Sequence, residues 1–267
     1  MRLEETLHQL KQNKKKILSL FVTSGYPALG TTVPLVLALA NAGADLIELG
    51  IPFSDPIADG PTIQLSSETA LKNGITLQKT LEMVKEIRKQ SSIPLVLMGY
   101  ANPLYAFGLE KFLKTCSEIG VNGTIIPDLP LEESAEYKAL SNKYDIASIF
   151  LASPTTSDER LKQLDAASTG FLYCVSITGV TGERTGLANQ AEDFLKRARK
   201  NVTKNPLLVG FGIASADDAV NVSKYSDGVI IGSALMKTIG NASTNHVIEK
   251  AVEFVKPIRS ALDRMAQ

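Results

Sequence analysis

The chain has 267 residues and 28 basic and 28 acidic side chains, so its formal net charge is zero. A hydrophobic fraction of 44% and a charged fraction of 21% are typical of a globular protein with a sizeable core. The length allows two small domains or one large α/β barrel. Balanced charge argues against nucleic acid as the main partner, because binding a phosphate backbone usually needs a basic surface.

The rare residue types exclude several kinds of site. Cys116 and Cys174 are isolated, with neither a disulfide pattern nor zinc-ligand spacing, and this usage fits a reducing cytosol. The two histidines, His8 and His246, cannot build a histidine-rich metal site, and a serine–histidine triad is not expected. The sequence shows no signal peptide and no apolar stretch approaching the ~18 residues of a membrane span. We therefore expect a cytoplasmic protein without a metal.

Short apolar runs alternate with longer amphipathic runs, after a first amphipathic helix over residues 2–12. Continuous Val/Ile/Leu-rich runs are typical of parallel strands buried on both faces. The eight expected strands are Ile17–Val22, Asp45–Leu49, Leu95–Met98, Gly123–Ile126, Ala147–Leu151, Phe171–Val175, Leu207–Gly210 and Gly228–Ile231. The helical periodicity predicts helices over Thr31–Ala42, Thr76–Lys89, Leu109–Ile119, Leu131–Lys143, Ser157–Ala167, Ala188–Asn201, Ala216–Ser223 and Asn245–Met265.

Local signals refine the helix ends. Ser157 and Ser215 are each followed by two acidic residues, as expected of helix N-caps. Pro257 should bend the last helix, and a short extra helix is expected near Ser233–Thr238.

Eight strand–helix units in this length predict an α/β fold, a single (β/α)8 TIM barrel. It has an extra N-terminal helix and a short helix before the last helix. No linker divides the chain, so we expect one domain over residues 1–267. An open, doubly wound sheet has the same strand pattern and is the main competitor. The count of eight, and the absence of a Gly-x-Gly-x-x-Gly turn after the first strand, favour the barrel.

Glu48 is the leading candidate for catalysis. Side chains alternate along a strand, so Leu46 and Glu48 share the face that we place toward the barrel interior. Burial there should raise the pKa of Glu48 into the range useful for acid–base catalysis. The alternative is a structural glutamate that a tyrosine or main-chain donors satisfy. On the following loop, Asp55 and Asp59 fit turn chemistry as well, but the nearby Glu48 favours a functional Asp59.

The later loops point to an anionic ligand. The loop 176–186 is long and holds three glycines, so it can close over a ligand. Glycines at 210, 212 and 232, with a helix starting after Ser233, fit the usual phosphate site of the barrel, although each could also be a tight turn. No predicted strand contains lysine, which argues against a Schiff base. The residues near the mouth suggest a flat apolar ligand part: Phe21, Met98, Tyr100, Ile125, Leu151 and Phe211.

Several segments together resemble the tryptophan synthase alpha subunit family, and the resemblance covers the whole chain in order. They are Leu46–Gln64, Gly99–Pro103, Pro127–Pro130, Gly179–Gly182 and Gly210–Ile213. The resemblance implies retro-aldol cleavage of indole-3-glycerol phosphate to indole and glyceraldehyde 3-phosphate, in tryptophan biosynthesis and without a metal or organic cofactor.

The resemblance also implies individual roles. Glu48 would be a mobile acid/base. Asp59 would accept a hydrogen bond from the indole N–H and so stabilise the cationic intermediate. Tyr173 would pack near both carboxylates, and Thr181 would engage Asp59 when the lid closes. Phosphate would bind Gly182, Gly212, Gly232 and Ser233. The apolar mouth residues would line the indole pocket.

A partner is implied as well, a beta subunit that carries pyridoxal phosphate and receives indole through a tunnel in an alpha2beta2 heterotetramer. The expected contact residues are Pro52, Asp55, Asn102, Asp128 and Pro130. Some family members carry Arg where this chain has Ile177, which cannot make a charged contact in the lid. A catalytically silent subunit that only activates its partner remains an alternative. Another phosphosugar barrel, such as an isomerase, is argued against by the lack of a Lys or His at the mouth.

Overall fold

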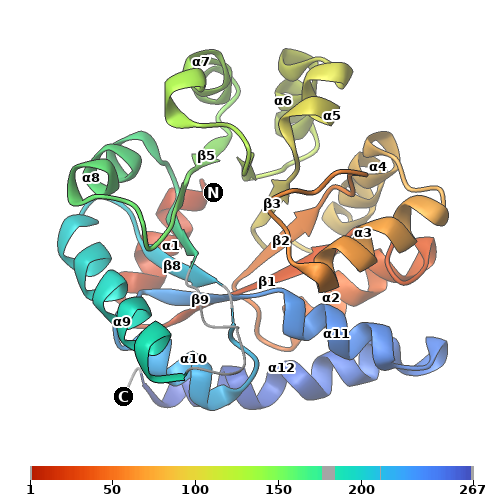
Figure 1. Ribbon diagram of the computed structural model, residues 1–267. Coiled ribbons are helices and arrows are strands. Elements are labelled where there is room, and N and C mark those ends of the chain that lie inside the picture. The colour runs from red at the N-terminus through yellow and green to blue at the C-terminus, as the bar shows by residue number, and fades with distance from the viewer. Residues whose placement is uncertain (1, 176–183, 211, 266–267) are drawn as a thin grey trace.

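A ring of parallel strands surrounded by helices forms the protein, as the computed structural model in Figure 1 shows. The structure describes residues 2–175, 184–210 and 212–265, and from 184 to 190 it describes the main chain alone. The barrel expected from the sequence is confirmed, including the N-terminal helix α1 (Leu3–Gln12).

The described strands pair in parallel, in the order β5-β4-β3-β2-β1-β9-β8-β7-β6. They are β1 (Ile17–Thr23), β2 (Leu46–Gly50), β3 (Leu95–Met98), β4 (Gly123–Ile125), β5 (Ala147–Ile149), β6 (Leu151–Ala152), β7 (Leu172–Val175), β8 (Leu207–Gly210) and β9 (Gly228–Ile231). The ends of this order, β5 and β6, are separated in sequence by Phe150 alone. They are two halves of the single strand expected over Ala147–Leu151, since β5 pairs with β4 and β6 pairs with β7. The barrel thus closes at its interrupted fifth strand.

One long helix accompanies each strand of the barrel, because each predicted amphipathic run has an apolar face to bury. These helices are α2 (Thr32–Asn41), α4 (Leu77–Arg88), α6 (Leu109–Glu118), α7 (Ala135–Lys143), α8 (Asp158–Ala167), α9 (Arg184–Asn201), α10 (Ala216–Ser223) and α12 (Val247–Arg264). Short 3-10 turns precede three of them: η1 (Leu29–Thr31), η2 (Leu131–Glu133) and η3 (Thr244–His246). The predicted N-caps are confirmed, since Ser157 and Ser215 each accept a main-chain N–H three residues later.

Two further helices lie in the strand-to-helix connections, and the sequence did not predict either of them. The first is α3 (Pro61–Lys72), which turns toward the barrel a face made largely of small residues, Ser66, Ser67 and Ala70. Such a face has little hydrophobic periodicity. The second is α5 (Ala101–Phe107), whose first N–H is capped by Asp128 from the next connection, with an N–O distance of 2.9 Å. A cap from so far along the chain leaves no local signal.

The expected short helix near Ser233 is confirmed and is longer than predicted, as α11 (Ser233–Asn241). Helix α12 continues through Pro257. Helix α7 begins at Ala135 rather than Leu131, because η2 occupies the start of the predicted run.

Two apolar layers build the core. Inside the barrel, Leu46, Val96, Ile125, Phe171 and other inward side chains form one cluster, and Leu3 and Leu7 of α1 close it from below. The outward residues of the same strands pack against the helices; Ile47 and Leu49 belong to this second layer. The alternation predicted for the second strand is therefore confirmed, and it turns Glu48 toward the interior together with Leu46.

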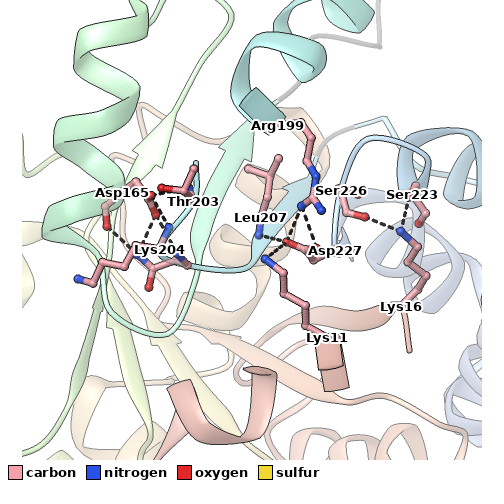
Figure 2. Close-up of polar contacts among 11 residues, drawn as sticks. Lys11, Lys16, Asp165, Arg199, Thr203, Lys204, Leu207, Ser223, Ser226 and Asp227 are labelled. Atoms are coloured by element: carbon pink, nitrogen blue, oxygen red, sulfur yellow. Dashed lines mark hydrogen bonds and ion pairs between the residues drawn. The ribbon is translucent and has the colours of Figure 1, made fainter. Parts of the chain in front are cut away.

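Polar side chains close the foot of the barrel, where the strands begin. Asp227, just before β9, accepts the main-chain N–H of Leu207 at 2.9 Å and pairs with Arg199 and Lys11 at 3.0 and 3.1 Å (Figure 2). Two strands away around the ring, just before β2, Asp45 accepts the N–H of Leu18 in the same way. These bonds tie neighbouring strands together at the end opposite the loops that follow the strands.

Candidate active site

Glu48 is a fully buried carboxyl group inside the barrel. It lies on β2 in register with Phe21 of β1 and has no exposed surface. Its Oε1 accepts a hydrogen bond of 2.7 Å from the hydroxyl of Ser19, while Oε2 is buried without a partner among the described residues. Burial raises the pKa of Glu48 to about 7, against the opposing effect of the Ser19 bond. Such a group can both take up and release a proton near neutral pH.

Asp59 lies on the loop after β2 and is supported by Tyr100. The Tyr100 hydroxyl donates to Asp59 Oδ2 at 2.9 Å and accepts the N–H of Ala58 at 3.1 Å. Burial raises the pKa of Asp59, and the bond from Tyr100 opposes that rise. The ring of Phe53 packs on Tyr100 with 5.5 Å between centroids. The sequence had placed Tyr100 in an apolar lining; in the structure its hydroxyl orients a carboxylate.

A cavity of about 260 Å³ opens at the mouth of the barrel beside Asp59. Its wall is mainly apolar at one end and carries main-chain groups of glycine and serine at the other. The lining residues are Phe21, Asp59, Gly60, Thr62, Ile63, Met98, Tyr173, Gly212, Ile213, Ala214, Ile230, Gly232, Ser233, Ala234 and Lys237. The expected residues Phe21, Asp59, Met98, Tyr173, Gly212, Gly232 and Ser233 are thus brought together around one cavity.

The polar end of the cavity is built for an anion. Helix α11 begins at Ser233, so its first N–H groups have no acceptor within the helix and point toward the cavity end. Gly212 has φ of 75°, a conformation that side chains other than glycine rarely adopt. Lys237 follows Ser233 by one helical turn and is not among the residues expected from the sequence. The sequence does carry a signal for it, since residues four apart on a helix share a face and the start of this helix is the expected phosphate site.

Tyr173 fills the space between the two carboxylates and the opposite wall. Its side chain is buried, and its pKa is raised well above the usual range by burial and by the charges of Glu48 and Asp59. Gly210 on β8 makes room for it, since a Cβ there would lie 2.4 Å from the Tyr173 hydroxyl oxygen. The expected position of Tyr173 near the carboxylates agrees with this geometry.

Some expected site residues lie elsewhere. Ile125 is fully buried in the barrel interior, and Leu151 lines a neighbouring cavity with Phe150 and Arg160. Neither is among the residues that line the main cavity. Thr181, Gly182 and Phe211, as well as Ile177, lie outside the described residues.

The residues expected to contact a partner differ in their exposure to solvent. Asp55, Asn102, Asp128 and Pro130 are exposed on the strand-to-helix connections around the mouth, with Asn102 in α5. Pro52 is buried and directly follows the buried Ile51, so it differs from the other four in exposure, and its contact with a partner stays a prediction.

Two absences apply to the described part of the chain. Its His, Cys, Asp and Glu side chains form no group of three that could hold a metal ion. None of its helices combines the length and the apolar character that crossing a bilayer requires.

A buried carboxyl group poised near neutral pH, a second carboxylate beside an apolar cavity and an anion-binding helix start define a class: a TIM-barrel enzyme that performs acid–base chemistry on a phosphorylated ligand. Comparison with known proteins makes this specific. The sequence model of the family "Tryptophan synthase alpha chain" matches residues 7–263. The chain belongs to this family, whose reaction is the cleavage of indole-3-glycerol phosphate in tryptophan biosynthesis.

Individual relatives support the assignment over nearly the full length. The tryptophan synthase alpha chain of Flavobacterium johnsoniae is 46% identical over 94% of this chain and 98% of its own. That of Geotalea daltonii is 44% identical over 98% of each chain. Among solved structures, the alpha subunit from Legionella pneumophila superposes with a TM-score of 0.88 at 38% identity over 98% of both chains. A chain of tryptophan synthase from Mycobacterium tuberculosis gives a TM-score of 0.87 at 31% identity, again over 98% of both.

Proposed function

We propose that Glu48 is the proton carrier of the alpha reaction in this chain and that Asp59 stabilises the charge that develops on the substrate. The observation that carries this assignment is the buried, half-satisfied carboxyl group of Glu48 behind the cavity wall formed by Phe21 and Tyr173. Because Glu48 lies behind the lining, its side chain has to turn toward the cavity to reach a ligand. The partnerless Oε2 leaves it free to do so at the cost of one hydrogen bond.

The chemistry needs two proton movements. Protonation of C3 of the indole ring produces a cationic indolenine, and Asp59 stabilises that charge by accepting the ring N–H. Removal of the proton from the glycerol hydroxyl next to the ring lets an aldehyde form as the carbon–carbon bond breaks. The bonding electrons return to the ring and neutralise it. Indole and glyceraldehyde 3-phosphate are released, and a carboxyl group with a pKa near 7 can serve each proton movement.

The polar end of the cavity holds the phosphate in this proposal. The N–H groups at the start of α11 and the backbone around Gly212 and Gly232 supply donors, and Lys237 supplies a positive charge. The indole ring then lies against the apolar residues Phe21, Met98 and Ile63. Thr181, Gly182 and Phe211 keep the roles predicted for them in the lid, the phosphate site and the indole pocket.

We further propose that the chain works with a tryptophan synthase beta subunit that carries pyridoxal phosphate. The strand-to-helix connections around the mouth, including α5, expose Asp55, Asn102, Asp128 and Pro130 together with the large apolar side chains of Ile57 and Tyr105. Leu65 on α3 is also exposed, beside a groove lined by Phe53 and Pro56. Exposed apolar side chains gathered at one edge are typical of a protein-binding surface.

The test is an assay of indole release from indole-3-glycerol phosphate, with and without a beta subunit. We expect slow release by the chain alone, faster release with the partner, and loss of about 10²–10⁴-fold in Glu48→Ala. Release by Glu48→Ala at the wild-type rate would refute the role of Glu48. If instead the double variant with Glu48→Ala and Asp59→Ala activated the partner fully and supported the overall reaction at the wild-type rate, the alternative of a purely regulatory subunit would hold.

A further inference from the structure

Ser19 donates a hydrogen bond to Glu48, and the proposed reaction of Glu48 and Asp59 assigns Ser19 no role. It lies on β1, is fully buried and points into the barrel. Its neighbours in register are Leu46 of β2 and Ile230 of β9, both members of the apolar interior cluster. A hydroxyl in such a layer has few possible partners, and this one donates to Glu48 Oε1 at 2.7 Å.

The position of Ser19 defines the orientation of Glu48. In register, Glu48 pairs with Phe21, which lies two residues further along β1, on the same face as Ser19. The carboxyl group therefore bends back toward the foot of the barrel, one layer below its own Cα, to meet the hydroxyl. This orientation keeps it behind the cavity lining that Phe21 and Tyr173 form.

The charges around Glu48 add no other support for its ionised form. The charges of Glu48 and of Asp59, on the loop after β2, both raise the pKa of Tyr173 on β7. The register neighbour on β3 is the apolar Val96. The bond from Ser19 is the influence that lowers the pKa of Glu48 against the effect of burial.

We propose that Ser19 is a positioning residue for the alpha reaction: its hydroxyl holds the Glu48 carboxylate in a resting orientation and keeps it ionised, ready to accept the hydroxyl proton of the substrate. The proposal rests on the role of Glu48 as proton carrier. It assigns a catalytic contribution to a side chain that does not touch the cavity.

Two variants separate the hydroxyl from the space it fills. Ser19→Ala removes the donor at almost the same side-chain volume, and Ser19→Cys keeps the shape of the side chain, slightly enlarged, with a much weaker donor. Carboxyl ¹³C NMR of the protein without substrate, with Glu48→Gln to assign the signal, measures the titration of Glu48 directly. We expect its midpoint to rise by about one pH unit in Ser19→Ala, because a bond to a charged group contributes that much, and by less in Ser19→Cys.

The rate profile is the second readout. The acidic limb of the kcat profile should move upward by the same amount, so that kcat at pH 7 falls about five-fold in Ser19→Ala and recovers at pH 9, while KM stays within about two-fold. Ser223→Ala is the control, since it removes another fully buried hydroxyl, near the foot of the barrel on α10, and should shift neither curve.

The outcomes distinguish the two levels of the proposal. An unchanged Glu48 midpoint in Ser19→Ala, in protein that melts like the wild type, overturns the role of Ser19. If the Glu48 titration midpoint rises but the rate profile is unchanged, Ser19 does stabilise the ionised form of Glu48, and Glu48 is not the proton carrier. Equal shifts in Ser19→Ala and Ser223→Ala would also overturn the proposal, because they would trace the effect to general loosening of the barrel.

Discussion

At the scale of single residues, the site combines two carboxyl groups whose surroundings differ. Glu48 is enclosed in the barrel, with one oxygen bonded to Ser19 and the other without a partner among the described residues. Asp59 lies nearer the solvent and receives a hydrogen bond from Tyr100. Burial raises the pKa of both groups, and in each a hydroxyl hydrogen bond, from Ser19 or from Tyr100, opposes that rise.

The burial of Glu48 predicts a pH-dependent cost to stability. Its pKa is raised from 4.5 to about 7, so folding favours the protonated form. This contribution is fully present below about pH 4.5 and is lost as the pH rises to about 7, which amounts to about 3 kcal/mol. Glu48→Gln should remove the loss, so the variant gains stability relative to the wild type between pH 5 and pH 8.

Urea unfolding of both proteins at several pH values measures this difference. The comparison cancels every other titrating group, because the two chains differ at one position. A constant difference between pH 5 and pH 8 would show that Glu48 titrates normally in the folded protein.

At the scale of elements, α11 places two residues at the polar end of the cavity, Ser233 at its start and Lys237 one turn later. Lys237 lines the cavity and has no ion-pair partner among the described residues. Lys237→Met should therefore raise KM for the phosphorylated substrate about five- to ten-fold while kcat changes little, since the charge contacts the substrate in both ground and transition states.

Steady-state kinetics at two salt concentrations checks this prediction. In the wild type, added salt should raise KM, and in Lys237→Met that dependence should be weaker. Lys256→Met on α12 is the matched control, because Lys256 is equally exposed but does not line the cavity. An equal effect in both variants would assign the change to net charge rather than to a contact.

The elements also show what sequence patterns can and cannot predict. The long helices and the strands follow from apolar periodicity, and their caps from Ser157 and Ser215. Helix α3 was missed because serines occupy much of its buried face, and α5 because Asp128 caps it from another connection. The break at Phe150 was missed for a related reason: a run of apolar residues does not reveal where its hydrogen-bond partner changes from β4 to β7.

At the scale of the whole molecule, the two ends of the barrel have separate tasks. Charged side chains join the strands at the foot (Figure 2), whereas the loops at the mouth carry the carboxylates, the cavity and the exposed apolar rim. Stability and catalysis should therefore be separable by mutation.

Asp227→Ala tests the foot. It leaves the N–H of Leu207 without its acceptor and removes the ion pairs with Arg199 and Lys11, so we expect a loss of about 3 kcal/mol in the free energy of unfolding. The kcat of the folded fraction should be unchanged. Asp263→Ala is the control: the Asp263 side chain is half exposed, and the buried Arg259 keeps its ion pair with Asp45, so the loss should cost less than about 1 kcal/mol.

Ile57→Ser tests the rim at the mouth. The Ile57 side chain is 82% exposed, so the variant should unfold like the wild type and release indole alone at the wild-type rate. Activation by a beta subunit should need about five-fold more partner, because an apolar contact of the proposed interface is lost. Titration of indole release against partner concentration measures this. An unaltered titration curve would move the interface away from this loop.

The sequence by itself determined the kind of barrel and the family, and it singled out Glu48 and Asp59 as the candidate reacting groups. Alternating apolar and amphipathic runs specify strands and helices, and the segment around Glu48 and Asp59 carries the family resemblance. The tertiary structure alone decided how those groups are held: Ser19 bonded to Glu48, Tyr100 to Asp59, Gly210 making room for Tyr173, and Lys237 at the phosphate end. The physical reason is that secondary structure follows from the spacing of neighbours along the chain. Partners from different strands meet only when the barrel closes, and no local pattern records which of them will be in contact.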